Sequence, residues 1–433
     1  MKKVLLAKSN LLLWAAVGLL LLFVFLPFAR FGRNDMPQAQ PAAYLWAGDP
    51  CLAPDPATIP GEGIATSFPA AEGGGIQPVR MVKDPYPTLD GIALDPGNNL
   101  SVMSDENRNS VLMYHLNSGN LSSAVTPPLR RILGPHTGVG FVAGVAVDPA
   151  RREVYVVNND IEDRMVVFHY DDDGDAVPVR SLYIPHQSWG ISLNRARGEL
   201  ALTVQQLHMI AIYRQNASKL DAPVRIIRGP GTGMADPHGV YWDVPHHEIV
   251  VVNDGSYSAI TKYGAYTAPV ARTKAFVSRG RFQAPSITVY PDTAQGNVAP
   301  LRTIQGSRTQ LDWPMGVAVD EAHNEIAVTN EADNSILIFR RSDQGNIAPL
   351  RVIRGNKTGI IGPVGIAFDQ EHGELWVANF GDHTALVFPS TAAGNVGPTR
   401  IIRNAPAGSA TGGFDNPYAA AYDTKRGEIL VPN

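Results

Sequence analysis

Five side chains with oxygen or nitrogen donor atoms could together bind a divalent cation if the fold brought them into one place. They are Asp90, Asp105, Asn158, His238 and Asn253. Carboxylate and amide oxygens of this kind suit Ca²⁺ or Mg²⁺. Because their spacing along the chain does not bring them together, the sequence predicts neither a metal site nor a cofactor.

Two shorter motifs also contain residues that could do chemistry. The run DDDGD, residues 171–175, lacks the acidic residue and the glutamate that an EF-hand register needs, since the chain has His169 and Arg180 there. His246 and His247 are adjacent, and adjacent side chains of a strand point to opposite faces. We predict an acidic turn and an exposed hairpin tip. No G-x-S-x-G nucleophile motif occurs, so no catalytic residue is predicted.

A repeat such as GVAVDEAHNEIAVTN, residues 316–330, provides the elements that must position these residues. It has seven copies, which begin at Gly91, Gly144, Gly190, Gly239, Gly316, Gly365 and, in the last copy, Ala419. Each copy contains two β-branched or aromatic runs joined by a turn that opens with Asp or Asn. These turn residues are Asp95, Asp148, Asn194, Asp243, Asp320, Asp369 and Asp423. Because such side chains accept hydrogen bonds from nearby backbone N–H groups, each copy predicts a hairpin.

A second repeated motif, Pro-x-Arg, predicts a further strand. It occurs at Pro78/Arg80, Pro128/Arg130, Pro178/Arg180, Pro223/Arg225, Pro300/Arg302, Pro349/Arg351 and Pro398/Arg400. Proline fits the first residue of an edge strand, where its missing N–H breaks no ladder. We expect the recurring arginine to make a structural contact within or between repeats.

Four strands in roughly 45–50 residues, repeated, are typical of β-propeller blades. The last copy stops at Asn433 after two strands, and the motif at Pro78 has no hairpin before it. We therefore predict an all-β, seven-bladed propeller over residues 63–433. In this prediction the C-terminal hairpin and residues 63–84 share one closing blade, which ties the termini together and removes free sheet edges.

The segments EVYVVNN, EIAVTNEADNSILIF and ELWVANF resemble the YVTN and NHL classes of bacterial β-propeller repeat. The resemblance covers about residues 63–433, and it implies a family composed mostly of binding and scaffold modules, with some enzymatic relatives. Some lactonase-like propellers bind a divalent metal at the channel mouth through Glu, Asn and Asp. In a propeller the residues before each repeat glycine lie at that mouth: Asp90, Ala143, Trp189, His238, Met315, Val364 and Tyr418.

The first 62 residues predict a membrane anchor and a linker. Residues 1–10 are basic and predicted to be cytoplasmic, and residues 11–29 carry no charge. This stretch would span roughly 28 Å as a helix, close to the thickness of a bilayer core. Lysines precede the span, so we predict a single-pass inner-membrane protein with its propeller in the periplasm. Residues 30–62 form a Pro/Ala-rich linker, and a cleaved signal peptide is the alternative to the anchor.

Composition excludes several classes of protein. A net charge of −4 and a pI near 6.3 argue against nucleic-acid binding. The single cysteine, Cys51, excludes an internal disulfide and a CxxC metal site.

An insertion at residues 254–285 distinguishes the fourth repeat from the others. It is rich in basic and aromatic residues: Tyr257, Lys262, Tyr263, Tyr266, Arg272, Lys274, Phe276, Arg279, Arg281 and Phe282. Arg and Tyr are favoured at interfaces, so we predict a loop that binds a partner protein. The alternative is a β-hairpin packed over the face of the propeller.

These features predict a non-enzymatic accessory or scaffold subunit of an inner-membrane complex, respiratory or photosynthetic, that binds other membrane proteins. The main alternative is a lactonase-like, metal-dependent hydrolase that uses the channel mouth. A periplasmic ligand sensor is the third hypothesis. The fold alone does not choose among them.

Overall fold

The computed structural model describes residues 85–160, 162–257, 281–409, 421–423 and 428–430. Apart from three single-turn 3₁₀ helices, η2 (Pro96–Asn98), η4 (Ser307–Thr309) and η5 (Phe380–Asp382), the regular elements in these ranges are strands. No helix among the described residues is long and apolar enough to cross a bilayer. The predicted span at 11–29 and the linker at 30–62 lie outside them.

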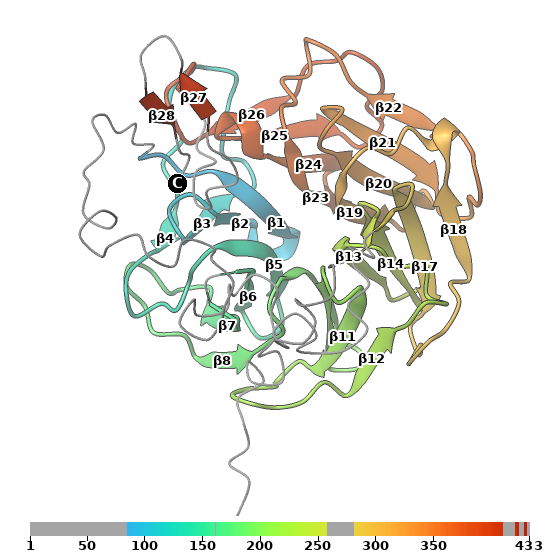
Figure 1. Ribbon diagram of the computed structural model, residues 1–433. Coiled ribbons are helices and arrows are strands. Elements are labelled where there is room, and N and C mark those ends of the chain that lie inside the picture. Colours follow the sequence, from blue (N-terminus) through green and yellow to red (C-terminus); the bar gives the residue numbers. More distant parts are fainter. Residues whose placement is uncertain (1–84, 161, 258–280, 410–420, 424–427, 431–433) are drawn as a thin grey trace, which may run out of the picture. The chain divides into compact units, whose positions relative to one another are not determined.

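The strands form six antiparallel four-stranded sheets, the blades, arranged around a channel (Figure 1). Blade 1 contains β1 (Leu89–Asp95), β2 (Leu100–Asp105), β3 (Ser110–His115) and β4 (Arg130–Ile132). Blade 2 contains β5 (Val142–Asp148), β6 (Glu153–Asn158), β7 (Arg164–His169) and β8 (Arg180–Tyr183). Blade 3 contains β9 (Ser188–Asn194), β10 (Glu199–Val204), β11 (Met209–Arg214) and β12 (Arg225–Arg228). Blade 4 contains β13 (Pro237–Asp243), β14 (Glu248–Asn253), β17 (Ser286–Pro291) and β18 (Arg302–Gln305). Blade 5 contains β19 (Pro314–Asp320), β20 (Glu325–Asn330), β21 (Ser335–Arg340) and β22 (Arg351–Ile353). Blade 6 contains β23 (Pro363–Asp369), β24 (Glu374–Asn379), β25 (Thr384–Pro389) and β26 (Arg400–Arg403).

The hydrophobic core is divided among the interfaces between consecutive blades. Each of six buried clusters joins two neighbouring sheets. The cluster that closes the ring packs Leu89 and Met103 of blade 1 against Trp376 and Ile402 of blade 6. Blade 6 therefore contacts blade 1 directly.

The prediction of a seven-bladed propeller with a split closing blade is wrong, because six blades complete the ring. The C-terminal hairpin, β27 (Ala421–Asp423) and β28 (Glu428–Leu430), forms a separate two-stranded sheet among the described residues. Residues 63–84, predicted to complete that blade, lie outside the described part of the chain.

A close backbone approach is common to all six junctions of the ring, and the seventh repeat lacks the glycine found at these junctions. A Cβ atom added to the repeat glycine would lie no more than 2.6 Å from a carbonyl oxygen of the next blade. The glycines and their facing carbonyls are Gly91 and Ala143, Gly144 and Trp189, Gly190 and His238, Gly239 and Met315, Gly316 and Val364, and Gly365 and Asp90. The seventh repeat has Ala419 at this position, and its Cβ would not fit such a contact.

The arginine of the Pro-x-Arg motif makes structural contacts, as predicted. Arg351 forms a bidentate pair with Glu325, at 2.7 Å for both bonds, and donates to the Ser390 carbonyl of blade 6 at 2.9 Å. Arg400 repeats this arrangement with Glu374 and with the Leu116 carbonyl of blade 1. Bidentate arginine pairs are geometrically specific. They therefore join strands within a blade and blades to one another, including across the junction of blades 6 and 1.

The turn that precedes each Pro-x-Arg motif forms hydrogen bonds to the blade before it. In DQGNIAPLRVIRG, residues 343–355, the N–H of Gly345 donates to the Thr303 carbonyl of blade 4 at 2.7 Å. The next residue, Asn346, accepts a bond from the Arg308 N–H at 2.7 Å. The DDDGD run forms the same kind of hydrogen bond between blades, because Asp175 accepts from the His136 N–H of blade 1 at 2.8 Å. The prediction of an acidic turn is confirmed.

The close approach at the junction of blades 6 and 1 can be tested with Gly365→Ala. We expect the free energy of unfolding to fall by about 1–3 kcal/mol, because the new methyl group must displace the Asp90 carbonyl. Gly397→Ala is the control in the same blade, since its Cβ meets nothing closer than the Lys357 carbonyl at 3.6 Å. Urea denaturation of both variants provides the comparison, and equal effects would contradict the contact.

Closure by six blades predicts that a fragment of residues 85–409 folds without the C-terminal hairpin. All six clusters lie within this fragment, so it should unfold in one cooperative thermal transition. A fragment of residues 137–409 lacks blade 1 and exposes two interfaces, and we expect it not to fold. If the longer fragment fails as well, the six interfaces are not sufficient.

Candidate functional site

One end of the channel, the mouth, is formed by two sets of loops that follow the same pattern in every blade. One set enters the innermost strand, and the other joins the second strand to the third. In each blade a backbone N–H of the second loop donates to a carbonyl of the first, at 2.8–3.1 Å. The donor and acceptor pairs are Glu106 and Thr88, Asn159 and Phe141, Gln205 and Gln187, Asp254 and Asp236, Glu331 and Trp313, and Phe380 and Gly362. The side chains at these positions differ from blade to blade, so the mouth is a fixed frame with variable groups.

The channel contains a cavity of about 70 Å³, large enough for a few water molecules. Of the predicted mouth residues, five line it: Asp90, Ala143, Trp189, Met315 and Val364. His238 is not among the lining residues and instead packs edge-on against the Trp189 ring, with centroids 5.2 Å apart. Tyr418 lies outside the described residues.

Asp90 has an environment that disfavours its ionised form. It is 1 % exposed, and its Oδ2 has no hydrogen-bond partner among the described residues. Burial, together with the negative charges of Glu106 and Glu331, raises the pKa of Asp90 well above its usual value. Burial also raises the pKa of Glu331 to about 7. Asp90 therefore takes up a proton at a higher pH than an exposed aspartate does.

The five candidate ligands named from the sequence do not assemble into one site. Asn158 accepts from the Gly140 N–H and donates to the Gly138 carbonyl, which orders the loop before β5. Asn253 and Asp105 likewise accept from backbone N–H groups of Ala235 and Thr88. These three side chains are structural caps.

The adjacent histidines lie at a hairpin turn of blade 4, as predicted. His246 contacts Asp243 at 2.8 Å, and His247 contacts Asp292 at 3.2 Å. Asp243 also accepts a hydrogen bond from the His246 N–H, as expected for an Asp that opens a turn. The two imidazoles face different carboxylates and share no ligand atom.

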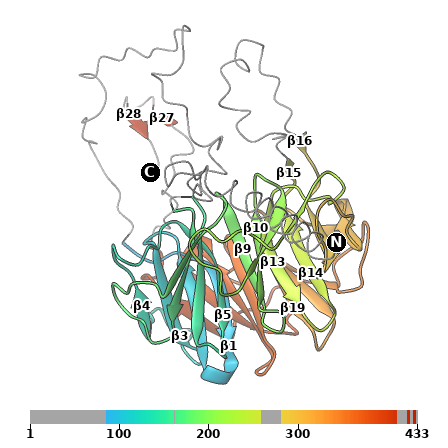
Figure 2. The same cartoon turned by 90° about the horizontal axis from the view of Figure 1, so that it is seen from below.

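The insertion begins at the mouth as a short antiparallel stem of β15 (Ser256–Tyr257) and β16 (Arg281–Phe282). Figure 2 shows this stem beyond the ends of β13 and β14. Phe282 is 74 % exposed. The other predicted partner-binding residues that fall between the two strands lie outside the described residues: Lys262, Tyr263, Tyr266, Arg272, Lys274, Phe276 and Arg279.

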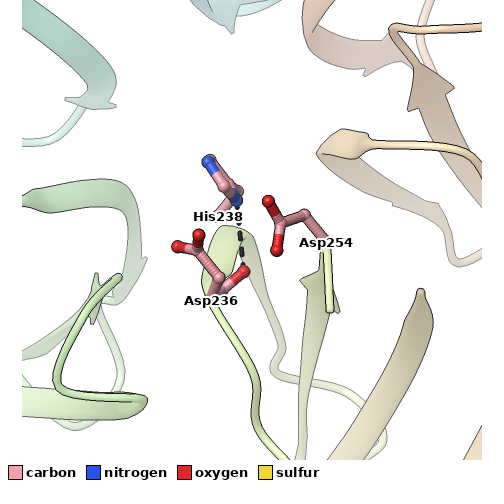
Figure 3. A group of neighbouring side chains, drawn as sticks. All are labelled: Asp236, His238 and Asp254. Atoms are coloured by element: carbon pink, nitrogen blue, oxygen red, sulfur yellow. Dashed lines mark hydrogen bonds between the residues drawn. The ribbon is translucent and has the colours of Figure 1, made fainter. Parts of the chain in front are cut away.

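Three side chains of blade 4 converge at the mouth: Asp236, His238 and Asp254 (Figure 3). One ligand atom from each lies within 4.8 Å of the other two. Asp236 and His238 flank the first residue of β13, and Asp254 follows the last residue of β14. The register pairs Pro237 with Asn253, which places positions 236 and 254 opposite each other. A bulge between Pro237 and Val240 interrupts the ladder and turns His238, which is 4 % exposed, toward the two carboxyl groups.

The electrostatics of this cluster are set by burial and by the two neighbouring carboxyl groups. Burial and the charge of Asp254 raise the pKa of Asp236 to about 8. Burial also raises the pKa of Asp254. The pKa of His238 falls to about 4, because its cationic form loses hydration. At neutral pH the imidazole is therefore uncharged, and the two carboxyl groups share one proton.

Sequence reasoning identified His238 but missed Asp236 and Asp254 as its neighbours. The signal was present in the repeat alignment, because the two aspartates occupy the positions that flank the paired residues Pro237 and Asn253. No other blade has acids at both positions. In each repeat, the residue after the second strand can be compared with the residue three positions before the repeat glycine. This comparison would have paired the two aspartates.

No known protein-family model matches the chain, and no curated protein matches it. The resemblance to YVTN and NHL repeats therefore stays a prediction, and the function must be argued from the site.

The shared proton predicts a pH dependence of stability that Asp236→Asn should change. In the unfolded chain Asp236 ionises near pH 4, whereas in the folded protein its pKa is about 8. Its contribution to stability is thus complete below about pH 4 and declines as the pH rises to 8. We expect the variant to be more stable than the wild type at pH 9, relative to pH 5, by about 1 kcal/mol or more.

Thermal denaturation across this pH range checks the prediction. Glu371→Gln, in an exposed hairpin turn of blade 6, is the control and should follow the wild type. If the stability of Asp236→Asn changed with pH in parallel with that of the wild type, Asp236 would already be ionised in the folded protein.

Proposed function

We propose that this protein is a membrane-anchored periplasmic propeller whose mouth binds partner membrane proteins. It serves as an accessory or scaffold subunit of an inner-membrane complex, of the respiratory or photosynthetic kind. The β-propeller fold is consistent with a scaffold for protein interactions. The anchor, the compartment and the complex rest on the sequence of the first 62 residues.

The observation that carries the proposal is Trp313, at the entrance to β19. Its φ is +54°, in the left-handed region where a bulky side chain is unfavourable, yet its side chain is exposed and 52 % accessible. The loop imposes this conformation in five of the six blades, because the equivalent residues Phe141, Gln187, Asp236 and Gly362 have φ between +45° and +58°. Trp313 differs in its exposure, since the aromatic Phe141 is only 8 % exposed. Because an exposed, strained tryptophan contributes little to folding, we infer that it is retained for binding.

Other apolar side chains are exposed on the mouth loops of the two blades that neighbour the blade of Trp313. Phe282 and Ile361 are exposed on mouth loops of blades 4 and 6, on either side of blade 5. Aromatic anchors among less apolar neighbours are typical of the centre of a protein interface. The partner surface is therefore expected to offer an apolar pocket for the indole.

A metal-dependent hydrolase is the second candidate, and the cluster of Asp236, His238 and Asp254 favours it. The cavity beneath the mouth, about 70 Å³, is too small for an organic substrate. A substrate would have to bind outside the cavity, among the loops of the mouth. Hydrolysis of lactones or esters by the purified chain would support this candidate.

Native electrophoresis of membranes in mild detergent, with mass spectrometry, tests the docking proposal. We expect the full-length chain to migrate with a larger membrane complex. Trp313→Gly should release it while leaving the melting temperature nearly unchanged, because glycine removes the strain at this position. The matched control is Leu301→Ser, which removes an exposed apolar side chain from the outer rim of blade 4 and should leave the complex intact.

Migration of the wild-type chain alone would contradict the subunit proposal. Release by both variants would show that the contact is a general apolar one and does not depend on the mouth.

A further inference from the structure

The three converging side chains of blade 4 form a ligand set as well as an acidic pair. The set contains one imidazole and two carboxyl groups, within 4.8 Å of one another. Structural and catalytic metal sites use such combinations, and three protein ligands leave further positions for water. Hard cations such as Ca²⁺ instead take six to eight oxygen ligands, so the histidine points to a first-row transition metal.

We propose that Asp236, His238 and Asp254 bind one divalent transition-metal ion, of which Zn²⁺ is the representative, with water completing its coordination. Figure 3 shows the His238 nitrogen that contacts the Asp236 carbonyl facing the space between the two carboxyl groups. This nitrogen is Nδ1, which lies 3.2 Å from that carbonyl oxygen. The inference does not depend on the docking proposal, because Trp313 belongs to another blade.

One atom of the cluster lacks the partner that a buried oxygen normally has. Asp236 Oδ1 is buried and has no hydrogen-bond partner among the described residues. An unsatisfied buried oxygen beside a second carboxyl group is costly, because desolvation and like charge add. A divalent cation coordinated by both carboxylates removes both penalties.

Neighbouring groups hold the three ligands in place. The Ser256 N–H donates to Asp254 Oδ1 at 2.7 Å, and the backbone N–H of Asp236 donates to His208 Nδ1 at 3.0 Å. The Gln205 side-chain amide lies 2.8 Å from His238 Nε2, on the far side of the ring. Metal-ligating histidines are oriented by such a group on the second nitrogen. When Nδ1 binds the metal, Nε2 carries the proton and the amide turns its oxygen toward it.

The Trp189 ring packs edge-on against the imidazole on the channel side, 5.2 Å away, and so keeps that side apolar. Because Trp189 also lines the channel cavity, its ring shields the imidazole on that side. An apolar shell of this kind strengthens metal–ligand electrostatics.

Equilibrium dialysis of the full-length chain, stripped with a chelator and then exposed to Zn²⁺, tests the proposal. Elemental analysis should find about one zinc per chain. Asp254→Asn and His238→Gln should each lower the affinity by more than about 100-fold, because a ligand is lost. Gln205→Leu should keep the stoichiometry and lower the affinity by about 10–100-fold, the usual effect of losing a supporting group.

His323→Gln is the matched control for the imidazole. His323 also contacts a carboxylate, with its Nδ1 2.8 Å from Asp320, but it lies at an exposed hairpin turn of blade 5. This variant should bind zinc as the wild type does. Trp313→Gly should also bind zinc normally, which separates the metal site from the docking surface.

Two results would overturn the proposal. One is a folded wild-type chain, verified by circular dichroism, that retains no zinc after dialysis. The other is zinc binding that Asp254→Asn leaves unchanged, since Asn keeps the shape of the side chain and should fold. The visible spectrum of Co²⁺ in the same site provides a second readout, because loss of the imidazole changes it even where affinity is hard to measure.

Discussion

The structure depends on a close contact between the innermost strands. Each repeat glycine faces the carbonyl of the residue before the next glycine, at a separation that leaves no room for a Cβ atom. Glycine weakens a strand by roughly 0.5–1 kcal/mol relative to alanine, so its use in all six blades has a steric reason. The contact sets how near neighbouring blades approach each other around the channel.

Hydroxyl groups reinforce this contact at alternate junctions. Thr329 accepts the Gly316 N–H at 2.7 Å and donates to the Val364 carbonyl of blade 6 at 2.6 Å. Ser104 and Thr203 make the same bridge from blade 1 to blade 2 and from blade 3 to blade 4. The equivalent residues of the other three blades are apolar: Val157, Val252 and Ala378. The ring thus consists of three pairs of blades joined by these hydroxyl bridges. The junctions between the pairs depend more on hydrophobic packing and on the hydrogen bonds of the outer turns and arginines.

The sequence predicted the blade, its four strands, its Asx turns and the structural role of the arginine. These features are local, and each depends on residues a few positions apart in one repeat. The number of blades was predicted wrongly, because it depends on a contact between repeats, which periodicity does not reveal. Seven similar hairpins were counted as seven blades, although Ala419 breaks the glycine pattern in the last one. The alanine at position 419, where the other six repeats have glycine, was the sign in the sequence against a seventh blade.

The candidate site was only partly predictable for the same reason. His238 stood out by its residue type, but its partners come from the loops on either side of the β13–β14 pair, where the hairpin register decides which side chains meet. Every blade has this loop pairing, but only blade 4 has acids at both positions, whereas blades 1 and 5 have one each, Glu106 and Glu331, and the other three have none. The inner ring is fixed by glycines and carbonyls, not by the mouth side chains. Blade 4 can therefore place two aspartates and a histidine on a frame that the other five blades hold rigid. The energetic cost of clustering like charges then falls on the mouth loops and leaves the ring contacts intact.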